Sequence, residues 1–282
     1  FLIVILGAIL GKCKKLTPQF TEAADWLVFK IALPIMLFSE VAGSRPEEDI
    51  DWKLVLFLII SVTLSFSAVA VIVTLAVKDK SKRGALIQGI CRSNFAILGV
   101  PLAVNMFGDV GGQAIAIAMP FVIVMFNSYS VVILSLFSES EDEKMSGKKL
   151  FGILKNVVTN PLIIGVLLGI VVMLSGIKLP QFATKTLSYL SGLTTPLALL
   201  SLGANFKIES LHGRVGYAIV GSLGKTTVLP IIAVTAAVLV GLRGPSLGVV
   251  LICFGAPTAV SSYIMAKKMD NDHELAAQIL LL

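Results

Sequence analysis

The run from Leu54 to Val77 carries no charged side chain, and neither does the run from Leu162 to Leu174. The first is long enough to cross about 30 Å of hydrocarbon, which takes roughly 20 residues of helix. Hydrophobic residues make up 56% of the chain and charged residues 14%, so no soluble core could absorb this apolar surface. Because unpaired backbone amides cannot face lipid, the sequence predicts an all-α membrane protein.

Ten apolar runs follow one another along the chain. The first and the last are too short to span a bilayer, so we expect the first helix to be longer in the whole protein and the last to be truncated here. The ten runs are Phe1–Leu10, Thr21–Val41, Trp52–Val77, Gly84–Phe107, Gly112–Phe137, Leu150–Leu174, Gln181–Ala204, Gly216–Val240, Pro245–Ala266 and Glu274 onward.

One fixed offset relates the two parts of the chain. Pro18-Gln19-Phe20 recurs as Pro180-Gln181-Phe182, and Ile90-Cys91 recurs as Ile252-Cys253, each pair 162 residues apart. An ungapped offset of this kind indicates a duplicated half. Since each half contains an odd number of crossings, five, the second half enters the membrane upside down. The sequence therefore predicts ten transmembrane helices arranged as two inverted five-helix repeats.

The repeat sets the expected domain boundaries. Residues 1–137 form the first five-helix repeat, residues 138–149 a polar cytoplasmic linker, and residues 150–282 the second, inverted repeat. Fifteen Lys and Arg residues lie in one set of alternate connections and five in the other, which places the richer set in the cytoplasm. The net charge of +6 is thus explained by topology in a lipid bilayer, and we expect no nucleic-acid partner.

The fourth and ninth runs contain residues that interrupt a helix. Gly99 and Pro101 follow Asn94 in the fourth run, and Pro257 lies in the ninth. We predict that both helices are broken and cross near the middle of the membrane, where the N-termini of the half-helices favour an anion. Asn94 is the main candidate for contacting it, and its alternative role is a hydrogen bond between helices.

Further polar residues within the runs are candidates for the same substrate site. Arg92 and Lys225 are cations inside predicted spans, so each should face a cavity or a partner, unless Arg92 reaches the cytoplasm and Lys225 only packs a helix pair. Asn127 is an isolated amide that could instead join two helices. The hydroxyl residues of the ninth run complete the set: Thr258, Ser261 and Ser262.

Several kinds of chemistry find no support. Cys13, Cys91 and Cys253 have no paired spacing, so we expect neither a disulfide framework nor a metal site. Gly224-Lys225-Thr226 resembles the end of a phosphate-binding loop, but Ile219 stands where that motif requires glycine. No nucleophile and base stand at catalytic spacing, so we expect neither an enzyme nor a cofactor.

The chain resembles the auxin efflux carrier family, which comprises plant carriers and bacterial organic-acid transporters. The resemblance runs through nearly the whole chain and rests on four segments: Ser93 to Pro101, Asn160-Pro161, Val240 to Gly244, and Ala256-Pro257 followed by Ala266-Lys267. It implies a scaffold part and a transport part with two crossing broken helices, moving by an elevator-like step. It also implies that Asn94 contacts a substrate carboxylate and that Pro101 and Pro257 break their helices.

The resemblance leads to a functional hypothesis. The large cytoplasmic loop of the long plant carriers is absent, which favours a small carboxylate such as malate or malonate over auxin itself. We expect a secondary or facilitated transporter of the cytoplasmic membrane, and the sequence leaves a homodimer open. A sodium-coupled symporter of the bile-acid type and a ligand sensor that does not transport remain alternatives. We expect no Asp or Glu in the middle of a span, which favours transport driven by a gradient or the membrane potential.

Overall fold

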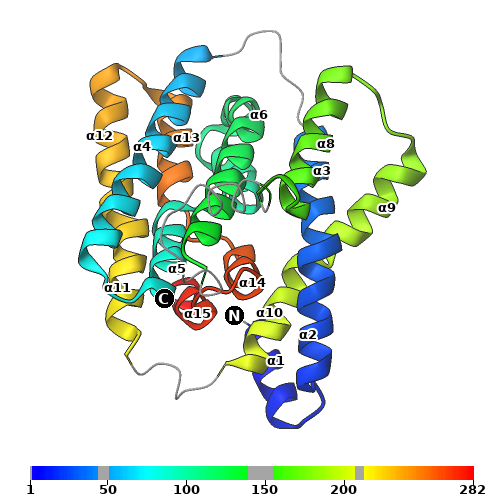
Figure 1. The fold of residues 1–282 in the computed structure, drawn as a ribbon. Coiled ribbons are helices and arrows are strands. Elements are labelled where there is room, and N and C mark those ends of the chain that lie inside the picture. The colour runs from blue at the N-terminus through cyan, green and yellow to red at the C-terminus, as the bar shows by residue number, and fades with distance from the viewer. Residues whose placement is uncertain (1, 44–50, 139–154, 156, 207–212) are drawn as a thin grey trace.

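Every regular element that the structure describes is a helix. The structure is a computed structural model, and it describes residues 2–43, 51–138, 155, 157–206 and 213–282. The prediction of an all-α protein is confirmed for these residues (Figure 1). In the first half the helices are α1 (Leu2–Lys12), α2 (Pro18–Leu27), the π-helical turn η1 (Val28–Ala32), α3 (Leu33–Ala42), α4 (Trp52–Ala76), α5 (Lys80–Cys91) and α6 (Phe95–Leu136).

The second half is likewise helical. It contains α8 (Pro161–Ser175), α9 (Gln181–Gly192), α10 (Thr194–Asn205), α11 (Val215–Leu223), the π-helical turn η3 (Gly224–Val228), α12 (Leu229–Val240), α13 (Gly244–Gly255), α14 (Ser261–Lys268) and α15 (His273–Leu281). Apart from Ser138, the predicted linker at 138–149 lies outside the described residues.

Four helical segments are long and apolar enough to cross a membrane. They are Trp52–Ala76, Lys80–Leu136, Gln181–Asn205 and Val215–Val240, and shorter apolar helices accompany them. Large apolar side chains point outward from these segments; Leu75 on α4 and Leu239 on α12 are each 82% exposed. Outward-facing leucines at this exposure suit a lipid environment. The chain is therefore an integral, multi-pass membrane protein.

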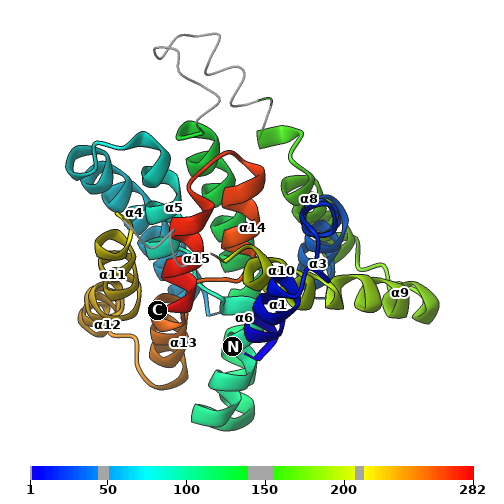
Figure 2. The ribbon, with the colours of Figure 1, turned by 90° about the horizontal axis from the view of Figure 1, so that it is seen from below.

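The helices form two sides of the molecule. In Figure 1 helices α1, α2, α3, α8, α9 and α10 lie together on one side, and α4, α5 and α11 to α13 lie on the other. Figure 2 shows the same division from below, with α14 and α15 between the two sides. Helix α6 packs against α13, α4 and α5, and it also contacts α3 and α8, so it joins both sides.

Two helix pairs on the first side pack backbone to backbone. Helix α1 lies on α10, and α3 lies on α8. A methyl group added at Gly7 would lie 2.5 Å from the carbonyl oxygen of Leu200, and one added at Gly169 would lie 2.9 Å from that of Phe38. Each glycine is needed because the partner backbone occupies the space that a side chain would fill. The two contacts are related by the 162-residue offset.

These contacts lead to a first prediction. The substitution Gly7→Ala is expected to lower the stability of the protein by about 1–3 kcal/mol, since the new methyl group overpacks the α1–α10 contact. The measurement is thermal unfolding of the detergent-purified protein. Gly192→Ala is the control, because an added methyl group there meets nothing within 4 Å. Equal melting temperatures for the two variants would contradict the packing argument.

Two interruptions of the helices meet each other. Residues Arg92–Asn94 separate α5 from α6, and residues 256–260 separate α13 from α14. The backbone N–H of Asn94 donates to the carbonyl oxygen of Pro257 at 2.8 Å, and the hydroxyl of Ser93 donates to that of Ala256 at 3.3 Å. The breaks predicted in the fourth and ninth runs are therefore present and in direct contact.

The position of the first break differs from the predicted one. Gly99 and Pro101 lie inside α6, after the interruption rather than in it. The ring of Pro101 removes one N–H from the helix but does not end it, since neighbouring turns remain paired. A sharper turn in α6 occurs at Gly108, whose φ of 63° and ψ of −147° are open to glycine almost alone. Gly108 falls between the fourth and fifth predicted runs, whereas Pro257 lies within the second break.

Candidate functional site

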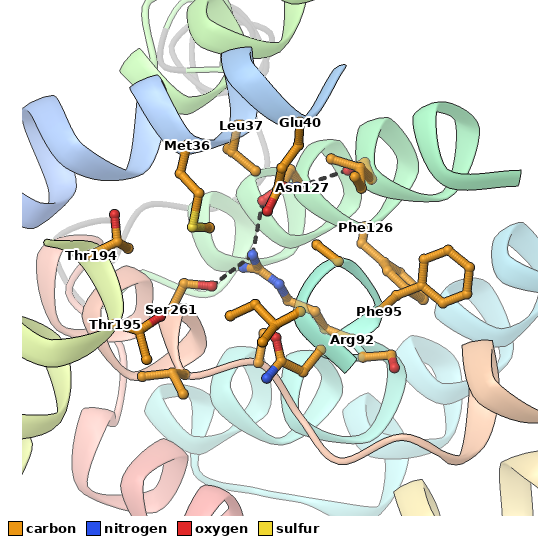
Figure 3. Close-up of a pocket in the computed structure, with 17 residues that line it drawn as sticks. Met36, Leu37, Glu40, Arg92, Phe95, Phe126, Asn127, Thr194, Thr195 and Ser261 are labelled. Carbon is orange, nitrogen blue, oxygen red and sulfur yellow. Dashed lines mark hydrogen bonds between the residues drawn. The ribbon is translucent and has the colours of Figure 1, made fainter. Parts of the chain in front are cut away.

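A small cavity lies where the two sides of the molecule meet the crossing breaks. Its walls come from α3, from the first break and the start of α6, from the later part of α6, from the start of α10 and from the second break. The cavity encloses about 30 Å³, which is room for about two water molecules. Among the candidates from the sequence, Arg92, Asn94, Asn127 and Ser261 line it (Figure 3).

Arg92 is the central cation of this cavity. It is the first residue after α5, in extended conformation, and only 3% of it is exposed. Its Nη2 donates to Oδ1 of Asn127 at 2.9 Å and to the hydroxyl of Ser261 at 2.8 Å, while Nη1 contacts the sulfur of Met265. The guanidinium therefore remains buried in the cavity and does not reach the cytoplasm. Two segments distant in sequence, α6 and α14, therefore converge on the positive charge of Arg92.

Asn127 fixes one side of this arrangement. Its Nδ2 donates to the carbonyl oxygen of Ile123 at 2.8 Å, one turn earlier in α6, which orients Oδ1 toward Arg92. Ser261, the first residue of α14, holds the guanidinium from the opposite break. Arg92 is thus positioned by one residue from each half of the chain, as Figure 3 shows.

The N-terminus of α6 opens into the same cavity. Asn94 is the N-cap residue of α6, but its side chain makes no capping hydrogen bond to the helix. The backbone N–H groups of Phe95 to Ile97, which line the cavity, have no partner within the helix because they lie in its first turn. A helix N-terminus carries a partial positive charge of about +0.5, so these groups add to Arg92 in favouring an anion.

Three candidates from the sequence lie away from the cavity. Thr258, in the second break, and Ser262, in the first turn of α14, are buried, and their hydroxyls lie 3.4 Å apart. Lys225 lies in η3, is 1% exposed, and is packed near the thiols of Cys91 and Cys253. Its Nζ has no hydrogen-bond partner among the described residues. None of the three belongs to the set of residues that line the cavity.

The polar residues of the cavity that the sequence analysis did not name as candidates include Glu40 and Thr194. Glu40, on α3, points toward the guanidinium of Arg92, and their opposite charges interact (Figure 3). The sequence analysis expected no acidic residue in the middle of a span and did not name Glu40 as a candidate. Glu40 lies one residue before the end of the second predicted run. From the sequence alone, a carboxylate at that position looks the same as one at the membrane surface. Thr194, at the start of α10, places a buried hydroxyl in the cavity wall that has no partner among the described residues.

A second buried charge cluster joins α14 to the first side of the molecule. Asp25 on α2 is fully buried, and its carboxylate accepts hydrogen bonds from Ser201 on α10 and Lys267 on α14, both at 2.5 Å. Asn205 donates to the carbonyl oxygen of Ser201 at 2.8 Å and completes the cluster. The ion pair links α14 to α2, and the hydrogen bond from Ser201 adds α10. In the part of the chain that the structure describes, no three His, Cys, Asp or Glu side chains gather to hold a metal ion.

Comparison with known proteins agrees with this architecture. A family model described as "Membrane transport protein" matches residues 1–282. The chain is 27% identical over 290 aligned positions to an uncharacterized transporter of Methanocaldococcus jannaschii, covering 98% of this chain and 90% of the relative. It is 24% identical to an uncharacterized transporter of Methanothermobacter thermautotrophicus, covering 99% of this chain and 90% of that protein.

Proposed function

Because the chain belongs to the membrane transport protein family, that of the auxin efflux carriers, we propose that it carries a small organic anion across the cytoplasmic membrane. The substrate class is a carboxylate of the size of malate or malonate. Transport is secondary or facilitated, and the substrate binds in the cavity around Arg92.

One observation carries the proposed substrate class. Arg92 is a buried guanidinium at the crossing of two interrupted helices, and the first turn of α6, Phe95 to Ile97, lines the same cavity. An arginine presents a planar set of donors that matches a carboxylate, and a helix N-terminus adds partial positive charge. The side chain of Asn94, which makes no capping hydrogen bond to α6, supplies a further donor in the cavity wall.

The arrangement of helices supports a transport mechanism with a moving part. The paired glycine contacts at the 162-residue offset and the contact between the two breaks fit ten spans in two inverted repeats. We propose that α1 to α3 and α8 to α10 form a scaffold, and that the crossing helices move past it in an elevator-like step. The cavity holds about two waters, so it must widen to admit a carboxylate.

The test is counterflow in liposomes containing the purified protein. Vesicles preloaded with unlabelled malate or malonate should accumulate the labelled acid from outside, because a carrier exchanges substrate between its two faces. Binding of the acid without counterflow would identify a sensor and refute transport. Accumulation that requires sodium would select the bile-acid-type symporter instead.

A substitution tests the site itself. Asn94→Ala is expected to weaken carboxylate binding by about tenfold or more, since one hydrogen bond to a charged group contributes about 1.5–3 kcal/mol. The measurement is isothermal titration of the purified protein with malate. Asn105→Ala is the matched control, because Asn105 is an exposed asparagine of the same helix outside the cavity. Unchanged affinity in Asn94→Ala would remove this residue from the site.

A further inference from the structure

The proposed substrate cavity contains one negative charge as well as one positive charge. Glu40 comes from α3, on the proposed scaffold, and Arg92 comes from the break between α5 and α6, on the proposed moving part. The two side chains line the same cavity and point toward each other (Figure 3). Among the residues that the structure describes, no other charged side chain lines it. The cavity without substrate therefore has a net charge of zero.

A substrate carboxylate would compete with Glu40 for the same guanidinium. Asn127 and Ser261 already occupy Nη2 of Arg92, and Met265 lies against Nη1, so few donors remain. Two carboxylates at one buried cation repel each other strongly, because little water is present to screen them. The conflict is resolved when one of the two carboxylates takes up a proton.

We propose that Glu40 is a proton-coupling residue, whose carboxylate is replaced at Arg92 by that of the substrate and takes up one proton from water. The proton adds to a carboxylate oxygen of Glu40, and no other bond is made or broken. This inference rests on the proposed function, since it concerns the same cavity and the same class of substrate.

Charge balance favours this exchange. In the empty site the charge of Arg92 is balanced by Glu40, and in the loaded site it is balanced by the bound carboxylate while Glu40 is neutral. For a monocarboxylate the site keeps zero net charge in both states. A dicarboxylate such as malate adds the charge of its second carboxyl group, so the loaded site carries one negative charge instead of the two it would carry with Glu40 ionised. A site with less net charge is the less costly one to move through hydrocarbon, because a charge without a partner is unfavourable there.

Among the described residues packed around Glu40, Arg92 is the charged residue that faces it. Helix α3 packs on η1, α6, α8 and α9, and α8 contains no titratable side chain. The titratable residues of the other three elements do not line the cavity: Lys30, Asp109, Tyr129, Lys185 and Tyr189.

The experiment is titration of the purified protein with malate, in two buffers that differ in their enthalpy of ionisation and across a range from mildly acidic to mildly alkaline pH. Wild type is expected to take up about one proton per malate at alkaline pH. In the pH range where Glu40 is ionised in the free protein, the apparent Kd should rise about tenfold per pH unit, because the protein with protonated Glu40 is the form that binds. Glu40→Gln should bind malate without proton uptake and with a Kd that does not change with pH.

Two further variants make the result specific. Glu40→Asp keeps a carboxylate and should keep the pH dependence, whereas Glu22→Gln removes an exposed carboxylate of α2 outside the cavity and should behave as wild type. Malate binding without proton uptake in wild type, or the same uptake in Glu40→Gln, would overturn the role of Glu40 and leave the proposed function standing. If neither malate nor malonate binds to wild type at any pH, the proposed function and this inference both fall.

Discussion

Arg92→Gln is expected to lower the affinity for malate by about 100-fold and to abolish counterflow. Within the described parts of the chain, the guanidinium is the only cation in the wall of the cavity, and its loss removes charge-assisted hydrogen bonds that contribute about 3 kcal/mol together. Glutamine is chosen because its amide can still donate to Asn127 or Ser261, which limits the damage to the fold. The measurements are titration with malate and counterflow in liposomes.

Two controls separate charge from geometry. Arg92→Lys keeps the charge but loses the planar set of donors, so its affinity should fall between those of wild type and Arg92→Gln. Lys185→Gln removes one positive charge from an exposed position on α9 and should leave binding unchanged. If Arg92→Gln retains wild-type affinity while it melts at the wild-type temperature, the substrate does not bind at this cavity.

The second large effect concerns the ion pair between Asp25 and Lys267. Lys267→Met is expected to destabilise the protein by about 3 kcal/mol, because it leaves the fully buried carboxylate of Asp25 with Ser201 as its remaining hydrogen-bond donor. The side chain of Lys267 is 23% exposed, which places the effect at the lower end of the values for buried pairs. Thermal unfolding in detergent measures it.

A double substitution distinguishes the pair from general damage to α14. Asp25→Asn combined with Lys267→Met should restore much of the lost stability, since no charge is then buried without a partner. Lys268→Met removes the same charge from the next residue, which takes no part in the pair, and should change the melting temperature little. Equal destabilisation by Lys267→Met and Lys268→Met would show that the ion pair is not what matters.

The sequence predicted the all-helical class correctly, because the bilayer requires both apolar composition and a fully paired backbone. It placed the first break too late, however. Gly99 and Pro101 are the residues that weaken a helix most in isolation, yet the interruption lies at Arg92–Asn94. There the backbone N–H of Asn94 is hydrogen-bonded to the carbonyl oxygen of Pro257. The two residues lie far apart in the chain, so local helix propensity could not predict this contact.

The candidate site was predictable where a polar residue is unusual in its own run. Arg92, Asn94 and Asn127 stand out in this way, and the structure brings them to one cavity. Glu40 and Thr194 do not stand out, because their positions near a helix end look like surface positions until the tertiary fold is known. Lys225 stands out equally strongly, yet it is packed near Cys91 and Cys253 instead. An unusual polar residue in an apolar run therefore indicates a buried polar position, but it does not tell whether that position lies in the candidate site.

The hydrogen bond between Asn94 and Pro257 joins the two halves of the chain through main-chain atoms alone. Replacing the asparagine side chain therefore leaves this link in place, and only an imino acid at position 94 would delete the donor. The side chain at position 94 can therefore change with the ligand. The contact between the two breaks is made by a backbone N–H that every amino acid except proline has. Selectivity at this crossing can change in evolution without loss of the junction that supports it.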